Sequence, residues 1–319
     1  MCVNKSAKPL LAIVGPTATG KTDVSVIVAR NLNGEIISAD SMLIYRNMDI
    51  GTAKPYPEER GGVPHYMIDV VNPDEDFNVS LYCKYIKNIL DSIYKRKKLP
   101  LLVGGTGLYI RSVVDGYNFT EAGSDPELRE KLLHECETMG KIALHEKLRG
   151  VDPESASRLH INDVKRVIRA LEVYYLSGKT ISESSDRSGS GKYNLKMFGL
   201  TMDRALLYER IEKRVDRMIL RGLVDEVKSL LERGYSEELT SMQGLGYKEI
   251  ILYLKGKMTL EEAVDLLKKR TRNFAKRQLT WFRRDNRIIW IDVAGRGPAE
   301  VAAEITAKAE GVFKPASND

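Results

Sequence analysis

The chain has 319 residues, of which 43% are hydrophobic and 29% charged, and its formal net charge is +6. These values are ordinary for a globular protein and exclude a collagen-like or globally disordered chain. The longest apolar runs, such as residues 10–14, fall far short of the ~18 residues of a membrane helix, so no membrane partner is expected. The length predicts about two domains, or one large domain with an insertion.

The three cysteines, Cys2, Cys83 and Cys136, are scattered along the chain. An odd number without paired spacing fits neither a disulfide framework nor a cysteine-based metal site. The first residues also lack the apolar stretch of a secretory signal. The sequence therefore predicts a protein of the reducing cytoplasm.

Short apolar runs alternate with helical patterns in the first third of the chain. Strands are predicted at residues 10–14, 35–40 and 100–103, with a weaker candidate at 66–70, and helices at 23–31 and 80–95. Glycine, proline and charge are abundant at 47–64, which is typical of a long loop. This alternation of strands and helices predicts a parallel α/β sheet.

The pattern changes near residue 120. Helical patterns follow at residues 127–139, 141–149, 153–159 and 163–176, ended by Gly178 and a Ser/Gly-rich loop at 182–191. Strand patterns then return at 196–201 and 287–292, with helices at 205–233, 259–284 and 298–308 and a break expected near Gly222. We expect a core of residues 1–119 and 196–319, interrupted by an all-helical domain at 120–195.

The strongest motif is the run Gly15-Pro16-Thr17-Ala18-Thr19-Gly20-Lys21-Thr22, between the first predicted strand and the first predicted helix. It matches the phosphate-binding loop G-x-x-x-x-G-K-[ST] in its proper strand–helix context. Backbone N–H groups of such a loop surround phosphate oxygens, Lys21 neutralises their charge, and Thr22 can bind Mg²⁺. The motif predicts a P-loop NTPase-like parallel sheet flanked by helices. It leaves open whether the ligand is a nucleotide such as ATP or another diphosphate.

Two features of nucleotide hydrolases are missing. The predicted strand at 100–103 ends in Gly-Gly-Thr-Gly rather than in the aspartate that orients Mg²⁺, and no Asn-Lys-x-Asp guanine motif occurs. Asp40, at the end of the second predicted strand, lies where open α/β sheets bind ligands. It is either a general base or metal-orienting group, or a solvated residue that caps the next turn.

Basic residues are concentrated near the C-terminus. Nine of them lie between residues 268 and 287, against one acid, Asp285. Such a run is usually a solvated helix face. Because it contains Phe274, Trp281 and Phe282, it also fits nucleic-acid binding. These residues alone leave both interpretations open.

The order and spacing of several segments resemble those of bacterial tRNA dimethylallyltransferases, also called tRNA isopentenyltransferases. The resemblance extends from Ala12 to about Trp290. Its most specific landmarks are Asp-Ile-Gly-Thr-Ala-Lys-Pro at 49–55 and Lys-Arg-Gln-Leu-Thr-Trp at 276–281. The others, beside the phosphate loop, are residues 40–46, 101–107, 166–172 and 244–248.

This resemblance implies transfer of a dimethylallyl group from dimethylallyl diphosphate to N6 of the adenosine at tRNA position 37, on the 3′ side of the anticodon. The phosphate loop would hold the isoprenoid diphosphate together with Mg²⁺ and Arg214. Thr17 would orient the reacting groups, and Asp40 would accept the N6 proton as general base. The implied partners are the tRNA anticodon stem-loop and dimethylallyl diphosphate, and we expect a monomer.

The resemblance also implies a set of tRNA contacts, namely Asp40, Ser41, Met42, Leu43, Thr106, Arg129, Lys165, Arg166, Arg169, Gln243, Gly246, Lys248, Lys276 and Arg277. Three positions depart from the family's pattern. Leu43 and Lys165 each replace a glutamine, which removes an amide that could read a base. Gln243 replaces an arginine and so removes a charge.

Two other hypotheses fit parts of the chain. A small-molecule or nucleotide kinase explains the phosphate loop, with the helical insertion and with Arg210 and Arg214 as lid residues. It leaves the basic segment unexplained. A non-catalytic RNA-binding ATPase explains the basic segment but not the surroundings of Asp40.

Overall fold

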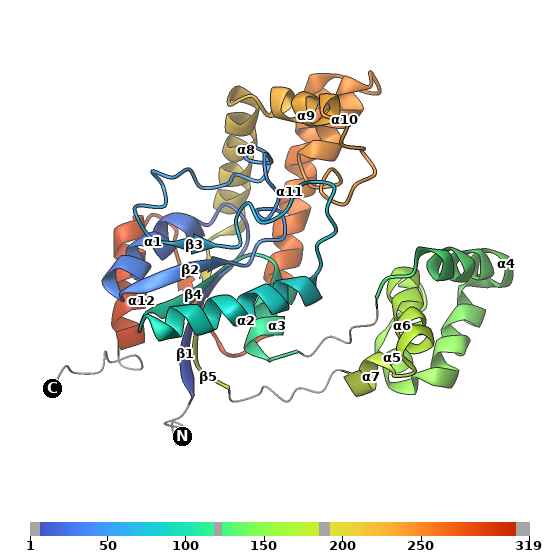
Figure 1. The fold of residues 1–319 in the computed structure, drawn as a ribbon. Helices are drawn as coiled ribbons and strands as arrows, with labels where there is room; N and C mark the ends of the chain where they lie inside the picture. Colours follow the sequence, from blue (N-terminus) through green and yellow to red (C-terminus); the bar gives the residue numbers. More distant parts are fainter. Residues whose placement is uncertain (1–6, 118–122, 185–191, 311–319) are drawn as a thin grey trace. The chain divides into compact units, whose positions relative to one another are not determined.

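The computed structural model describes residues 7–117, 123–184 and 192–310. The chain divides into two compact units, one formed by Met1–Val114 with Gly191–Asp319 and the other by Asp115–Ser190 (Figure 1). From the sequence, the expected insertion spans 120–195. The strand that follows the insertion begins at Tyr193, earlier than the predicted start at residue 196. It pairs with the first strand of the chain from Tyr193 onward, so these residues belong to the first unit.

The first unit is built around a six-stranded sheet in which every neighbouring pair is parallel. The order is β3-β2-β4-β1-β5-β6. The strands are β1 (Lys8–Val14), β2 (Gly34–Ser38), β3 (His65–Tyr66), β4 (Leu99–Gly104), β5 (Tyr193–Thr201) and β6 (Ile288–Asp292). The predicted parallel α/β sheet is confirmed. Since all strands run in one direction, their carboxyl ends meet at one edge, where such sheets bind ligands.

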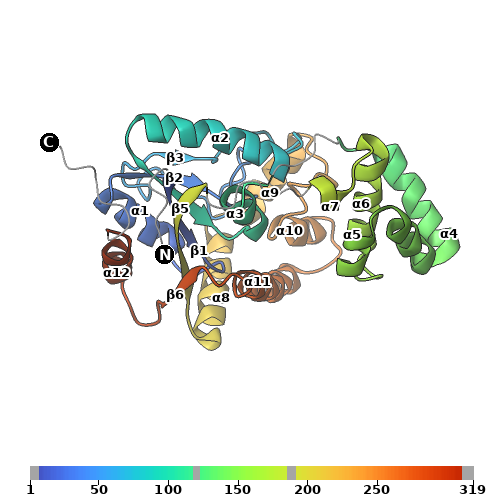
Figure 2. The same ribbon diagram turned by 90° about the horizontal axis from the view of Figure 1, so that it is seen from below.

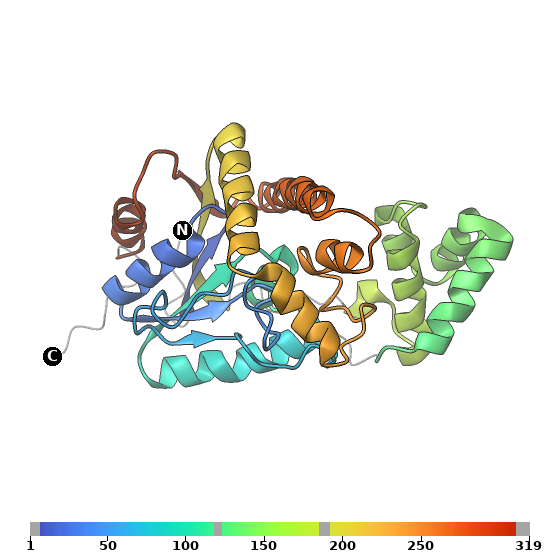
Figure 3. The ribbon, with the colours of Figure 1, turned by 90° about the horizontal axis from the view of Figure 1, so that it is seen from above.

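Helices cover both faces of this sheet (Figures 2 and 3). Leu10 and Ala12 of β1 pack toward one pair of helices, and Leu11 and Ile13 pack toward the other pair. All four side chains are fully buried, and burial of a large aliphatic side chain contributes about 1.5–3 kcal/mol. The helices are α2 (Val79–Lys95) and α3 (Gly107–Val114) on the first face, and α1 (Lys21–Asn31) and α12 (Pro298–Glu310) on the second.

Four further helices pack beside one another next to the sheet (Figure 3). They are α8 (Arg204–Leu220), α9 (Leu223–Glu232), α10 (Tyr247–Leu254) and α11 (Leu260–Phe282). The predicted break near Gly222 is confirmed, because this residue has a φ of 95° and separates α8 from α9. Such a left-handed conformation is accessible to glycine at little cost.

Three local predictions were wrong or incomplete. No strand extends over residues 66–70, because Met67 and Asp69 have φ values of 63° and 55°, which no strand residue adopts. Helices α3 and α10 were not predicted. Both begin at glycines, Gly107 and the N-cap residue Gly246, which by themselves predict turns.

The second unit is all helical, as its sequence predicts. Its helices are α4 (Pro126–Val151), α5 (Pro153–Arg158), α6 (Val164–Ser177) and the short α7 (Ile181–Ser184). Gly140, with a φ of 87°, divides α4 where the sequence predicts two helices, and Gly178 ends α6 in the left-handed conformation. Leu132, Leu148 and Leu171 form its core. Most of the predicted loop at 182–191 lies outside the described residues.

Among the residues that the structure describes, no helix combines the length and apolar character needed to cross a membrane.

Candidate active site

The phosphate loop joins β1 to α1 at the carboxyl edge of the sheet. Gly15 has a φ of 142°, and a Cβ atom there would lie 2.6 Å from the carbonyl oxygen of Leu200. Gly20 is the N-cap of α1, with a φ of 81°. Gly15 has no room for a side chain, and the positive φ at both positions favours glycine. The predicted strand–loop–helix context is therefore confirmed.

Internal hydrogen bonds hold this loop in shape. The Thr19 hydroxyl donates to the Pro16 carbonyl oxygen at 2.9 Å, and Lys21 Nζ donates to the same oxygen at 2.7 Å. Ala18 adopts a positive φ of 66° between them. Because the loop closes on itself, its N–H groups are arranged for an anion before one binds.

Three charged side chains converge beside the loop. Burial, together with the nearby Arg214 guanidinium, lowers the pKa of Lys21 to about 8, and the Asp40 carboxylate acts in the opposite direction. Burial also lowers the pKa of Arg214, and here again Asp40 acts in the opposite direction. Arg214 reaches this place from α8 and lies 3.5 Å from the Thr52 carbonyl oxygen through Nη2. The predicted partners Lys21, Arg214 and Asp40 are thus close enough to act on one another.

Lys21 and Arg214 line a cavity of about 400 Å³. One wall is the start of α1, a second is the loop that precedes β3, and a third is the arginine-bearing face of α8. Its cationic residues are Lys21, Lys54, Arg210, Arg214, Arg217 and Arg221, and its acidic residues are Asp23, Asp49 and Glu59. The cations outnumber the acids, so the cavity is suited to a polyanionic ligand.

Asp40 follows β2 at the same edge and is half-buried. Its Oδ1 accepts the Met42 N–H at 2.9 Å, so the turn-capping role considered from the sequence is present. Within the described segments, Oδ2 accepts no hydrogen bond. The carboxylate is therefore held by one oxygen, and the other remains able to accept a proton.

Thr106 connects this turn to the end of β4. Its N–H donates to the Ala39 carbonyl oxygen at 3.0 Å, and its hydroxyl oxygen accepts the Ser41 N–H at 3.1 Å. The structure thus places Thr106 against Ser41, two residues for which the sequence predicts tRNA contacts. Leu43 and Met42 are half-exposed, and Met42 packs against Gly244.

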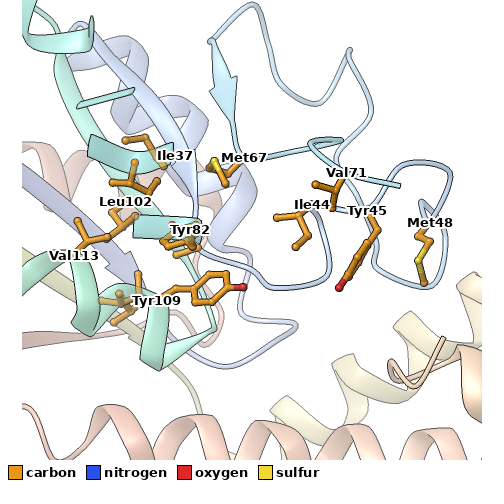
Figure 4. Close-up of a cluster of buried hydrophobic side chains, with 14 of the residues drawn as sticks. Ile37, Ile44, Tyr45, Met48, Met67, Val71, Tyr82, Leu102, Tyr109 and Val113 are labelled. Carbon is orange, nitrogen blue, oxygen red and sulfur yellow. The ribbon is translucent and has the colours of Figure 1, made fainter. Parts of the chain in front are cut away.

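Figure 4 shows Tyr45, Tyr82 and Tyr109 in a cluster of buried hydrophobic side chains. Tyr82 and Tyr109 stack with ring centroids 4.0 Å apart, and the Tyr82 hydroxyl donates to the Ser38 carbonyl oxygen at 2.8 Å. Burial raises the pKa of both hydroxyls, and the charge of Asp40 adds to the effect. Tyr45, like Tyr109, is buried. In this structure both rings are part of the core.

The family-specific segment 49–55 is held by one carboxylate. Glu226 at the start of α9 accepts N–H donors from Asp49 at 2.9 Å, Ile50 at 2.7 Å and Gly51 at 3.0 Å, and the Tyr247 hydroxyl at 2.7 Å. A Cβ at Gly51 would collide with the Tyr247 ring. These bonds fix the loop that forms one wall of the cavity.

Lys54 of the same segment is a buried cation with three oxygen partners. Its Nζ donates to the Tyr45 carbonyl at 2.9 Å, to Asp49 at 2.5 Å and to Asp69 at 2.5 Å. Three donors are matched by three acceptors, so this lysine stabilises the loop rather than offering a free charge to a ligand.

Gln278 is a residue of the site that the sequence reasoning missed. It lies on α11, is 6% exposed, and contacts the phosphate loop and the turn after β4 through its amide. The signal was present, because Gln278 continues the buried stripe of Ala275 and Phe282 on a helix otherwise rich in charge. A polar residue at a core position requires hydrogen-bond partners.

The basic residues of α11 fall into two groups. Three of those toward its start are paired, because Lys268 contacts Asp216, Arg270 contacts Glu249 and Arg272 contacts Glu212, each at 2.6 Å. Lys276 and Arg277 are exposed, and no carboxylate pairs with either of them in the part of the chain that the structure describes. These two are therefore available for an external anion. Trp281 is partly exposed and Phe282 is buried.

The segment 243–248, which carries three of the expected tRNA contacts, is tightly bonded. Gln243 Nε2 donates to the Glu237 carbonyl oxygen at 2.6 Å. Gly246, with a φ of 97°, begins α10, and its N–H donates to Glu249 at 2.8 Å. Lys248 follows in the first turn of that helix and is half-exposed. Gln243 and Gly246 thus stabilise this segment through their own hydrogen bonds.

In the second unit, two predicted tRNA contacts share one buried partner. Arg129 and Arg169 both bind the fully buried carboxylate of Glu172, at 2.8 Å and 2.6 Å. Lys165 is exposed, and Arg166 pairs with Asp163 at 2.9 Å while its side chain stays 68% exposed. Lys165 and Arg166 are consequently more exposed to a ligand than Arg129 and Arg169.

The residues of the phosphate loop fit a magnesium ion only together with a phosphate ligand. Over residues 7–117, 123–184 and 192–310, no group of three His, Cys, Asp or Glu side chains is arranged to bind a metal. The Thr22 hydroxyl, in the first turn of α1, takes part in no hydrogen bond of the described chain. One hydroxyl plus phosphate oxygens and water is a normal Mg²⁺ environment.

Comparison with known proteins gives a consistent family. The family model described as IPP transferase matches residues 43–285, and the model described as Isopentenyl transferase matches residues 8–72. A protein of Pelotomaculum thermopropionicum named tRNA dimethylallyltransferase is 54% identical over 315 residues, which is 98% of this chain and 100% of that protein. A protein of the same name from Desulforamulus reducens is 60% identical over 260 residues, covering 81% of this chain and 92% of its own.

Solved structures agree with these matches. The full-length tRNA isopentenylpyrophosphate transferase of Bacillus halodurans is 45% identical, covers 95% of this chain and 96% of its own, and has a TM-score of 0.72. A eukaryotic dimethylallyltransferase described as acting on tRNA is 30% identical, with coverages of 96% and 79% and a TM-score of 0.79. Because the first family model spans most of the chain and these relatives match over nearly its whole length, the chain belongs to the IPP transferase family.

Proposed function

We propose that this chain transfers a dimethylallyl group from dimethylallyl diphosphate to N6 of the adenosine at tRNA position 37. Relatives that are more than half identical carry the name tRNA dimethylallyltransferase, and the chain is accordingly a prenyltransferase that modifies tRNA. The observation that carries the finer proposal is the convergence of Lys21, Arg214 and Asp40 at the carboxyl edge of the sheet.

Departure of the diphosphate is the difficult part of this reaction. The bond between the allylic carbon and the diphosphate oxygen breaks, and the bond from N6 to that carbon forms. Lys21, Arg214 and the loop N–H groups stabilise the negative charge that develops on the leaving group. Mg²⁺ held at Thr22 would add charge neutralisation at the same oxygens. Thr17 lies in the loop where it can orient the diphosphate.

The amine must lose a proton as the new bond forms. Asp40 is proposed to accept it, because Met42 fixes the carboxylate through Oδ1 while Oδ2 accepts no hydrogen bond within the described chain. Its place beside Lys21 keeps the acceptor close to the allylic carbon. General base catalysis of this kind contributes about 10²- to 10⁴-fold in rate.

The end of β4 favours alkyl transfer over nucleotide hydrolysis. Nucleotide hydrolases carry an aspartate after a strand of this kind to orient Mg²⁺. Here that place is taken by Gly104, and a Cβ atom on it would overlap the backbone of Ala39. No acidic side chain can occupy this position without moving β2.

Binding of the tRNA is proposed to use exposed cations. Lys276 and Arg277 on α11 are available for phosphates, as are Lys165 and Arg166 in the second unit. Arg129 and Arg169 are engaged by Glu172 and can contribute only by sharing their remaining donors. Ser41, Leu43, Thr106, Gln243 and Lys248 remain proposed contacts to the anticodon stem-loop.

A nucleoside analysis tests the proposal directly. Purified protein is incubated with Mg²⁺, dimethylallyl diphosphate and unmodified tRNA that reads a codon beginning with U, and the tRNA is digested and weighed. An adenosine heavier by one C5H8 unit is expected at position 37. Transcripts with guanosine at position 37 serve as the control. No mass shift, or a shift at another nucleotide, would contradict the proposal, and ATP-dependent phosphorylation of a small molecule would favour a kinase.

A further inference from the structure

A single buried amide connects the two loops of the candidate site. Gln278 Oε1 accepts the N–H of Thr17 in the phosphate loop at 2.9 Å. Its Nε2 donates to the carbonyl oxygen of Gly105, in the turn after β4, at 3.0 Å. The side chain is 6% exposed, so water does not compete freely for these bonds.

The chemistry of the two partners fixes the orientation of this amide. An N–H can meet only the amide oxygen, and a carbonyl can meet only the amide nitrogen. Gly105 itself leaves the room for this contact, since a Cβ atom there would overlap Gln278 Nε2. Neither a shorter side chain nor an apolar one of equal length can make both bonds.

The turn after β4 carries the connection on to Asp40. Gly105 is followed by Thr106, which bonds to the backbone of Ala39 at 3.0 Å and to that of Ser41 at 3.1 Å, on either side of Asp40. The phosphate loop and the Asp40 turn belong to different βα connections, and Gln278 of α11 contacts the phosphate loop and the turn after β4. Gln278 therefore links the phosphate loop, through the turn after β4, to the residues on either side of Asp40.

We propose that Gln278 is a positioning residue for prenyl transfer, which holds the phosphate loop and the Asp40 turn in a fixed relative geometry. This inference rests on the proposed function, because it assigns the phosphate loop to the allyl donor and Asp40 to the amine. Small errors in such alignment are costly, and a misplacement of about 1 Å can lower a rate by about 100-fold.

The test compares Gln278→Met with Gln278→Glu. Methionine keeps the length and loses both bonds, whereas glutamate keeps an acceptor for Thr17 and loses the donor for Gly105. Asn273→Ala, an exposed position on the same helix, is the matched control. The measurements are the melting temperature, hydrogen exchange of the phosphate-loop amides, and the KM for dimethylallyl diphosphate and kcat, both with saturating tRNA.

For Gln278→Met, we expect faster exchange in the phosphate loop, a higher KM for the diphosphate, and kcat/KM lowered by about 10- to 100-fold. Gln278→Glu is expected to keep the exchange of wild type and still lose kcat, because a carboxylate oxygen faces the Gly105 carbonyl. Binding of tRNA alone should be unchanged in both variants, and Asn273→Ala should resemble wild type in every measurement.

Two results would overturn the inference. One is wild-type exchange and kinetics in Gln278→Met. The other is a lower melting temperature with unchanged kinetics per folded molecule, which would make Gln278 a packing residue only. If the methionine variant does not fold, wild-type kcat in Gln278→Glu has the same meaning. If the wild-type protein itself does not transfer the dimethylallyl group, the proposed function is contradicted. In that case the hydrogen-exchange comparison of wild type with Gln278→Met still tests whether Gln278 connects the two loops.

Discussion

The charge of Lys21 depends strongly on its surroundings. Burial and the neighbouring Arg214 lower its pKa to about 8, so a fraction of the free protein has a neutral lysine under mildly alkaline conditions. A diphosphate bound beside it favours the charged form. The group therefore takes up a proton on binding once the pH exceeds about 8.

We predict that affinity for dimethylallyl diphosphate declines as the pH rises through about 8, because the free lysine must first be protonated. Calorimetry in buffers of different ionisation enthalpy should show proton uptake above that pH and little below it. Lys21→Arg should bind without this pH dependence, since arginine stays protonated. An affinity that is flat between pH 7 and 9 in the wild type would contradict the prediction.

Asp40 allows proton acceptance to be separated from turn structure. Asparagine retains an oxygen for the Met42 N–H but cannot accept a proton. We predict that Asp40→Asn lowers the single-turnover rate constant by about 100-fold or more, with tRNA affinity and melting temperature nearly unchanged. Asp74→Asn, an exposed loop substitution, is the control. A variant that retains the wild-type rate would remove Asp40 from the role of base.

At the scale of elements, the loop between β2 and β3 is ordered by α9 and α10. The four donors that converge on Glu226 come from Asp49, Ile50, Gly51 and Tyr247. A charged acceptor with several short bonds is among the stronger arrangements in proteins. This explains why a glycine-rich segment without regular structure can form a wall of the cavity.

We predict that Glu226→Gln lowers the free energy of unfolding by about 1–3 kcal/mol, because one side-chain amide cannot accept all four donors. Urea denaturation followed by circular dichroism measures this change. Glu232→Gln on the same helix is a suitable control, since its only recorded ion pair among the described residues is an exposed one with Lys228 at 3.9 Å. Equal midpoints for the two variants would argue against the anchoring role.

Sequence patterns predict those elements whose signal is local. The phosphate loop, the parallel strands and the break at Gly222 all follow from spacing and glycine positions. Helices α3 and α10 were missed, because each begins at a glycine, Gly107 or Gly246, which by itself predicts a turn. The stripe of Ala275, Gln278 and Phe282 indicated that Gln278 needs hydrogen-bond partners. The partners themselves could not be predicted, since they lie 261 and 173 residues away in sequence.

At the scale of the whole molecule, some basic side chains are exposed and available for a ligand, whereas others form ion pairs within the protein. The net charge of +6 alone does not say which cations face a ligand. The structure separates Lys276 and Arg277, which are exposed, from Lys268 and Arg272, which are paired with acids at 2.6 Å. No composition argument could have made this distinction.

We predict that the double substitution of Lys276 and Arg277 by alanine weakens tRNA binding and reduces the slope of log affinity against log salt by about 1.5, because each phosphate contact contributes about 0.7–0.9. Filter binding over a range of salt concentrations measures the slope. Alanine at Lys268 and Arg272 changes the net charge equally, yet should change the slope less. Equal effects of the two pairs would mean that net charge, not position, governs binding.

The close approach of Gly104 to Ala39 also limits how this scaffold can evolve. A single nucleotide change in a glycine codon can produce aspartate, which would supply the carboxylate of a nucleotide hydrolase. At this position the new side chain would meet the backbone of the neighbouring strand connection, and the sheet would have to open. Conversion of such a transferase into a hydrolase therefore requires a change of backbone, so the two activities are separated by a structural barrier and not by one mutation.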